Sequence, residues 1–172
     1  KIRPGYGRAF QEEGHVCMAA GSTSQALLAY RHAVSLNNSL IASWAALTKI
    51  HTKKGNHDNA KITNIEYEKL KALPDELLSV RNMISEGHNY NAEQLCRKFL
   101  QKNKKNVEGM RLLASLGVAA DVLDDAEFLL EKALEFEPEN NFARHDYMVV
   151  LYQRQKYKQS LEQAKILLKK EP

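Results

Sequence analysis

The sequence predicts an all-α protein, a right-handed superhelical solenoid of about five helix-turn-helix units. Three observations favour this fold class: small residues that recur at a fixed interval, turn residues that keep step with them, and apolar residues with the spacing of one helix face. The composition agrees, because 172 residues include only four prolines and eight glycines while 44% are hydrophobic. Long helices joined by short turns are therefore expected.

One small residue marks the second helix of each unit. These residues follow one another at steps of 34, 32, 34 and 34, and they are Ala26, Ala60, Ala92, Ala126 and Ser160. Apolar residues then fall three, four and seven positions further along, as in Leu129, Leu130 and Ala133 after Ala126. This spacing forms an apolar stripe on a helix, and small residues within it let two helix axes approach closely.

The turn inside each unit lies five residues before the small residue. The five positions are Gly21, Gly55, Gly87, Asp121 and Gln155. Glycine readily adopts the left-handed conformation that ends a helix, and a polar residue just beyond it, such as Ser22 or Asn56, can cap the next helix. Tight turns between antiparallel helices are predicted at all five positions.

These markers divide the chain into a lead-in at 1–6 and a solenoid at 7–172. The units are expected at about 7–40, 41–72, 73–106, 107–140 and 141–172, each touching mainly its neighbours. The short step in the series predicts a two-residue deletion near Leu73 and Pro74, and the second unit fits the pattern least well. Because the sequence begins at Lys1 rather than Met and ends at Pro172 in an amphipathic pattern, we expect it to be part of a longer protein.

The pattern resembles the signature of the tetratricopeptide-repeat (TPR) family. Trp44 occupies the tryptophan position of that signature, whereas Gly117 replaces its usual tyrosine. The best-matching unit is 107–140, where the signature positions hold Met110, Leu113, Ala114, Ala126, Leu130, Ala133 and Pro138. The resemblance implies a non-catalytic protein-protein interaction scaffold that binds a peptide or a partner domain on its concave surface.

A narrower resemblance concerns the second half of the sequence. Strings such as AEQLCRKFLQKN and FARHDYMVVLYQRQKYKQSLEQAKILLKKEP look like the repeats that precede the catalytic domain of bacterial TPR-containing sulfotransferases. The alternative function is therefore an N-terminal interaction or regulatory domain of such an enzyme. A phosphate-binding loop after Pro172 would distinguish the two, and no catalytic residue can be carried over to this chain.

The resemblance also assigns the concave lining to the first helices of the units. Counting from the unit starts gives the candidates Arg8, Gln11, His15, Ala42, Ala45, Lys49, Leu77, Arg81, Glu108, Arg111, Ser115, Phe142, His145, Val149 and Tyr152. Three of them, Lys49, Arg81 and Arg111, predict attraction of an acidic peptide or a terminal carboxylate. The alternative is an ordinary solvated surface, because Glu108 and Asp146 can neutralise part of the charge.

Other kinds of site find little support. The histidines form no HExxH pair, Cys17 and Cys96 lie at apolar stripe positions, and no glycine-rich phosphate loop occurs, so no enzyme activity, metal or cofactor is expected. The net charge of +4 is dispersed, and nucleic-acid binding is not expected. No membrane span or export signal is present in the sequence. With reduced thiols, a cytoplasmic location is expected.

The final helix leads to one further expectation. It carries more apolar residues than one stripe can hide, including Leu161, Ile166 and Leu168. The sequence therefore predicts an uncovered surface and self-association, or contact with a downstream domain, through residues 157–172. A purely structural solenoid within an oligomer is the third interpretation of the chain.

Overall fold

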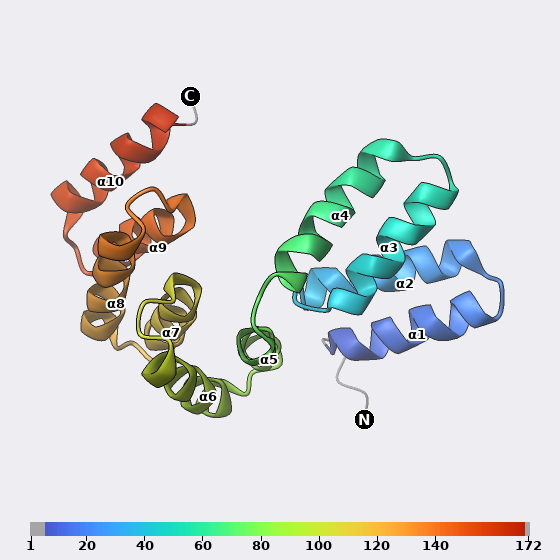
Figure 1. The fold of residues 1–172 in the computed structure, drawn as a ribbon, viewed down its shortest axis with the longest axis horizontal. Helices are drawn as coiled ribbons and strands as arrows, with labels where there is room; N and C mark the ends of the chain where they lie inside the picture. The colour runs from blue at the N-terminus through green and yellow to red at the C-terminus, as the bar shows by residue number, and fades with distance from the viewer. Residues whose placement is uncertain (1–5, 171–172) are drawn as a thin grey trace. The chain divides into compact units, whose positions relative to one another are not determined.

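The predicted all-α fold is confirmed. The computed structural model describes residues 6–170, which form ten α-helices and no β-strand (Figure 1). The helices are α1 (Gly7–Ala19), α2 (Thr23–Leu36), α3 (Ile41–Lys53), α4 (His57–Lys71), α5 (Asp75–Ser85), α6 (Asn89–Lys102), α7 (Val107–Ala119), α8 (Leu123–Phe136), α9 (Asn141–Gln153) and α10 (Tyr157–Lys170). Most of the predicted lead-in and the last two positions of the predicted final unit lie outside the described residues.

The chain forms two compact parts, each larger than one of the five predicted repeats. From here on the first unit is Lys1–His88 and the second unit is Asn89–Pro172. The division falls between α5 and α6, inside the repeat predicted at 73–106. Within the first unit, α1 packs on α2 and α3 on α4; within the second, α7 packs on α8 and α9 on α10 (Figure 1). Each of these pairs is a helical hairpin.

All five predicted turns are present, and they share one geometry. The turn residues have positive φ values of 77° at Gly21, 69° at Gly55, 79° at Gly87, 59° at Asp121 and 61° at Gln155. The next residue donates its backbone N–H to the carbonyl five positions back, as from Val122 to Gly117 at 2.8 Å. This is the Schellman ending of a helix, and here it turns the chain into the next helix.

Asparagine residues cap three of the helices. The side-chain oxygens of Asn56, Asn106 and Asn140 accept hydrogen bonds from backbone N–H groups in the first turns of α4, α7 and α9. The cap predicted at Asn56 is therefore confirmed, whereas Ser22 makes no side-chain cap bond to α2. Such caps satisfy donors that have no partner within the helix.

Small residues bring the helices of the first unit together. Ala26 is fully buried and packs with Tyr30, Leu47 and Ile50, and Trp44 lies against this cluster. Gly14 is required here, because a Cβ atom at this position would lie 2.6 Å from the Tyr30 ring. Helices α1 and α2 can therefore approach closely only while position 14 lacks a side chain.

The second unit has its core where α7, α8 and α9 meet. Ala126 packs with Ala114, Leu130 and Val150, all of them buried. A neighbouring cluster places Ala133 against α7 and α9, and Ala92 on α6 is also fully buried.

The second helix of the predicted 41–72 unit is packed less well. Ala60, which corresponds to the fully buried Ala26, is only half-buried. The contact between α3 and α4 includes a polar pair, in which the Thr48 and Thr63 hydroxyls lie 3.0 Å apart. This weaker packing agrees with the poor fit of the repeat pattern to this unit.

The predicted deletion lies within α5 rather than near Leu73 and Pro74. Helices α1, α3, α7 and α9 each have 13 residues, whereas α5 has 11. The number of residues from the start of α4 to the start of α5 equals the number from the start of α2 to the start of α3. The connection before α5 has thus kept its length while the helix itself is shorter, and α5 begins at Asp75, two residues after the predicted unit start.

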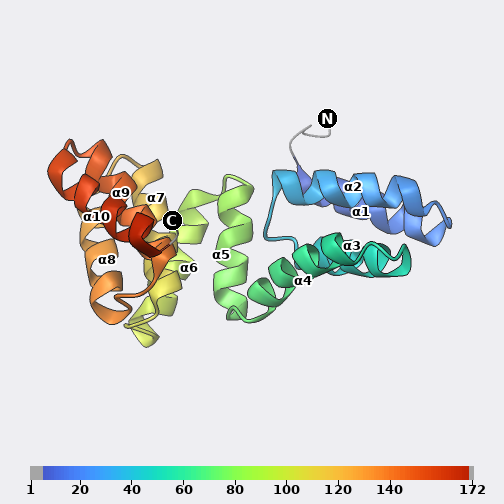
Figure 2. The same ribbon diagram turned by 90° about the horizontal axis from the view of Figure 1, so that it is seen from above.

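Helix α5 contacts the first predicted repeat, contrary to the expectation that each unit touches mainly its neighbours. Asn37 donates to Asn82 at 3.0 Å, Arg81 donates to Ser39 at 3.3 Å, and Arg8 pairs with Glu86. Figure 2 shows α5 running across the ends of the preceding helices rather than alongside them. Polar side chains on α5 and at its C-cap therefore connect this helix to α1 and to the loop between α2 and α3.

Candidate functional site

The predicted lining residues of the second unit lie on two adjacent first helices. Helix α7 carries Glu108 and Arg111, and α9 carries His145 and Tyr152. The two helices contact each other, and an ion pair crosses between them. We call this surface the α7–α9 face, and it is the part of the predicted site whose geometry is best defined.

Arg111 occupies the centre of the α7–α9 face. Its Nη1 donates to Glu108 Oε2 at 2.6 Å, and its Nε donates to Asp146 Oδ2 at 2.8 Å. The guanidinium carbon lies 5.3 Å from the centre of the Phe142 ring, within range of a cation–π contact. Two carboxylates thus compensate the charge of Arg111, as the sequence suggested for Glu108 and Asp146, and they fix its position.

An exposed stripe runs along α9 beside Arg111. Phe142, His145, Val149 and Tyr152 follow at helical spacing, and the side chains of Phe142 and Tyr152 are 64% and 65% exposed. Tyr157 from α10 extends the stripe, because its ring packs edge-on against that of Tyr152 with centres 5.6 Å apart. Tyr157 was not among the residues predicted from the sequence, although an aromatic residue at the start of a helix, next to a predicted turn, could have indicated it.

The lining residues of the first unit are placed differently from one another. Lys49 is exposed on α3, whereas Arg81 on α5 is half-buried and bonded to Ser39. Arg8 is paired with Glu86 at the C-cap of α5, and Gln11 accepts a hydrogen bond from the buried Ser43 at 3.1 Å. Two of the three cations expected to attract an acidic ligand, Arg81 and Arg111, are therefore engaged in contacts within their own units.

Leu77 was expected to line the groove, and this expectation is wrong. The side chain is fully buried, as is that of Val80 one turn further along. A side chain with no exposed surface cannot line a groove, so this part of α5 contributes to the interior of the protein instead.

Chemical groups for catalysis or metal binding are not gathered on this surface. Among residues 6–170 there is no cluster of three or more His, Cys, Asp or Glu side chains with the geometry to hold a metal ion. Burial raises the pKa of the Cys96 thiol to about 11, and its Sγ donates to the Gly109 carbonyl at 3.2 Å. A thiol in that environment is a weak nucleophile, because the thiolate is the reactive form. None of the described helices combines the length and apolarity needed to cross a membrane.

Comparison with solved structures identifies the fold. YrrB, described as a TPR protein with an unusual peptide-binding site, superposes with a TM-score of 0.51 at 14% identity, covering 95% of this chain and 85% of YrrB. The fold is that of the tetratricopeptide-repeat proteins. MamA from Desulfovibrio magneticus RS-1 has a TM-score of 0.51 at 12% identity, and the match covers 98% of this chain and 96% of the MamA chain.

One curated protein is similar in sequence. FK506-binding protein 59 of Drosophila melanogaster is 27% identical over 126 residues, which are 73% of this chain but only 28% of that protein. The chain thus spans about a quarter of the length of its curated relative. No protein-family model matches the chain. The similarity to sulfotransferase repeats stays a prediction on which these proteins do not bear.

Proposed function

We propose that this chain is a non-catalytic scaffold that binds a segment of another polypeptide on the α7–α9 face. The observation that carries the proposal is the exposed stripe on α9, in which Phe142 and Tyr152 are each about two-thirds exposed. Large aromatic side chains are enriched where proteins bind one another, because they bury much area at low cost in conformational entropy. The TPR fold supports the same function.

The charges around Arg111 restrict the chemistry of the ligand. Glu108 and Asp146 leave no net positive charge at the centre of the face. Binding here would therefore depend on contact between apolar or aromatic ligand side chains and the α9 stripe, with the fixed guanidinium adding a directed hydrogen bond. Attraction of an acidic peptide by Lys49, Arg81 and Arg111 stays a prediction, and exposed Lys49 is the member best placed to contribute to it.

Site-specific photo-crosslinking tests this proposal and does not require the partner to be identified beforehand. A benzoylphenylalanine residue in place of Tyr152 should capture a recurrent polypeptide, which mass spectrometry of the cross-linked peptides identifies. The substitution Phe142→Ser in the same protein should lower the yield severalfold, because it removes a neighbouring contact while leaving the buried core intact.

The same probe at Tyr90 provides the matched control. This tyrosine lies on α6 and is 74% exposed, so its accessibility is similar while its surface is different. Capture of the same polypeptides at positions 90 and 152 would contradict a specific α7–α9 face. Absence of any captured polypeptide at position 152 would contradict the proposed function itself.

Three further expectations stay predictions. The alternative of a sulfotransferase-type enzyme that continues after Pro172 would be tested by sequencing beyond that residue. Self-association through residues 157–172 and a cytoplasmic location likewise await direct measurement.

A further inference from the structure

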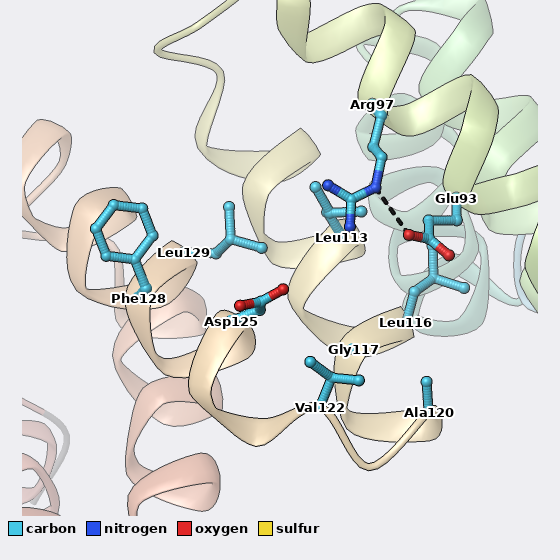
Figure 3. A pocket seen from close by; sticks show the side chains of 10 residues that line it. All are labelled: Glu93, Arg97, Leu113, Leu116, Gly117, Ala120, Val122, Asp125, Phe128 and Leu129. Carbon is cyan, nitrogen blue, oxygen red and sulfur yellow. Dashed lines mark hydrogen bonds and ion pairs between the residues drawn. The ribbon is translucent and has the colours of Figure 1, made fainter.

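A pocket of about 340 Å³ lies between α6, α7 and α8, within the second unit (Figure 3). Leu113, Leu116 and Gly117 of α7 form its floor. Its walls are Arg97 of α6 on one side and Asp125 and Phe128 of α8 on the other. The floor is apolar and the rim is charged, which is the usual construction of a site for an apolar group with a polar neighbour.

The pocket is separate from the α7–α9 face. Along α7, Arg111 and Ser115 project toward one side, whereas Leu113, Leu116 and Gly117 are rotated by more than a quarter turn from them at 3.6 residues per turn. The two surfaces therefore use different side chains of the same helix.

Gly117 contributes only backbone atoms to the floor of the pocket. Gly117 lies four residues before the turn residue Asp121, and the residues at this position in the other repeats are Cys17, His51, Met83 and Leu151. A Cβ atom on Gly117 would lie 3.3 Å from the Val122 carbonyl oxygen and 3.6 Å from the Ala126 Cβ, so the glycine lets α8 lie close to this part of α7. At Gly117 nothing projects into the pocket, and Leu116 on the floor is itself almost completely buried.

The charges on the rim are unequal. Arg97 Nε pairs with Glu93 Oε1 at 2.7 Å, so these two charges compensate each other (Figure 3). Asp125 is exposed and forms no ion pair with the residues that the structure describes. Neighbouring carboxylates are compensated, because Asp124 pairs with Arg154 and Glu127 pairs with Arg154 and Lys156. Asp125 is thus the uncompensated charge on the rim of the pocket.

We infer that this pocket is a second binding site, for a polypeptide segment that places one bulky apolar side chain next to a basic residue. The apolar side chain lies over Leu116 and Gly117 and against the ring of Phe128, which is 58% exposed without it. The basic residue reaches Asp125, which forms no ion pair with the residues that the structure describes, so its charge is available to a ligand. The site is independent of the function proposed for the α7–α9 face.

Two short labelled peptides test this inference, each with one central phenylalanine in a glycine-serine background. In one the phenylalanine is flanked by lysines, and in the other by glutamates. The lysine-flanked peptide should bind at least about tenfold more tightly by fluorescence anisotropy, because a charge-assisted contact is gained in one case and repulsion in the other. The changes that it causes in the amide shifts of the protein in NMR spectra should cluster at residues 113–128.

Two pairs of variants give the matched controls. Ala120→Leu adds a side chain at the edge of the pocket and should weaken binding about tenfold, whereas Ala119→Leu, at an exposed neighbour outside the lining, should not. Asp125→Lys should reverse the preference toward the glutamate-flanked peptide, whereas Glu131→Lys, the same charge change on an exposed part of α8, should preserve the order. A reversed preference cannot result from unfolding.

Several results would overturn the inference. Failure of the lysine-flanked peptide to bind, equal affinity for both peptides, shift changes centred on α9, or an unchanged preference in Asp125→Lys would each do so. Loss of cross-linking at Tyr152 alone would instead bear only on the α7–α9 face, so the two proposals fail separately.

Discussion

The substitution Ala126→Leu should destabilise the second unit by about 1–3 kcal/mol, the usual cost of overpacking a filled core. Ala126 is fully buried and packs with Ala114, Leu130 and Val150. A Cβ atom placed on Gly117 of α7 would lie only 3.6 Å from the Ala126 Cβ, so α7 and α8 are already in close contact. The added methyl groups must therefore push the two helices apart.

Urea denaturation followed by far-ultraviolet circular dichroism measures this loss. Trp44 is the only tryptophan and lies in the first unit, so the transition seen by its fluorescence should move less than the helical signal. Ala42→Leu, on the exposed side of α3, is the matched control and should change stability by less than about 0.5 kcal/mol. A similarly small effect of Ala126→Leu would refute the assigned repeat phase and the close approach of α7 to α8.

Three other outcomes are expected. Cys96 should resist alkylation in the folded protein at pH 8, while Cys17 reacts first. Burial raises the pKa of Cys96 from 9.0 to about 11, so its thiol loses its proton at a lower pH in the unfolded chain than in the folded protein. The stability of the fold should therefore fall as pH rises from about 9 to 11. Asp121→Gly and Gln155→Gly should each stabilise the chain by up to about 1 kcal/mol in thermal melts, since both residues have positive φ; a loss of stability would contradict the turn geometry. Light scattering should show an average molecular mass that increases with protein concentration. The double substitution Leu161→Lys and Leu168→Lys should abolish this increase, because both side chains are more than half exposed on α10. A parent chain that is monomeric at every concentration would contradict self-association.

The sequence predicted those features that depend on local and repeated interactions. Turn positions were recognised even at Asp121 and Gln155, where no glycine stands, because a fixed period carries information from one repeat to the next. The stripe at Ala126, Leu130 and Ala133 follows from helical spacing alone. These features depend on residues close together in the chain, and a single sequence reveals them.

Contacts between residues that lie far apart in the sequence were harder to predict. Leu77 was placed in the groove by counting from a predicted repeat start at residue 73. Because α5 is two residues shorter and begins at Asp75, the counted position falls on the buried side of the helix instead. The pairing of Arg111 with Asp146 was foreseen only in part, since the charges were visible but the geometry was not. The pocket beside Gly117 was not foreseen, although the sequence shows that a larger side chain is replaced at that position.

The hydrogen bonds of α5 also bear on how the first unit folds. A stack of hairpins has low contact order and can assemble outward from any point, whereas the pairing of Arg8 with Glu86 joins residues 78 positions apart. Closing a loop of that length costs entropy before its contacts contribute stability. The first unit should therefore fold as one cooperative block with a slower rate-limiting step than hairpin formation. Fragments that end before α5 lack the contacts between this region and the start of the chain. Progressive truncation should therefore remove the stability of α1–α5 in one step rather than repeat by repeat.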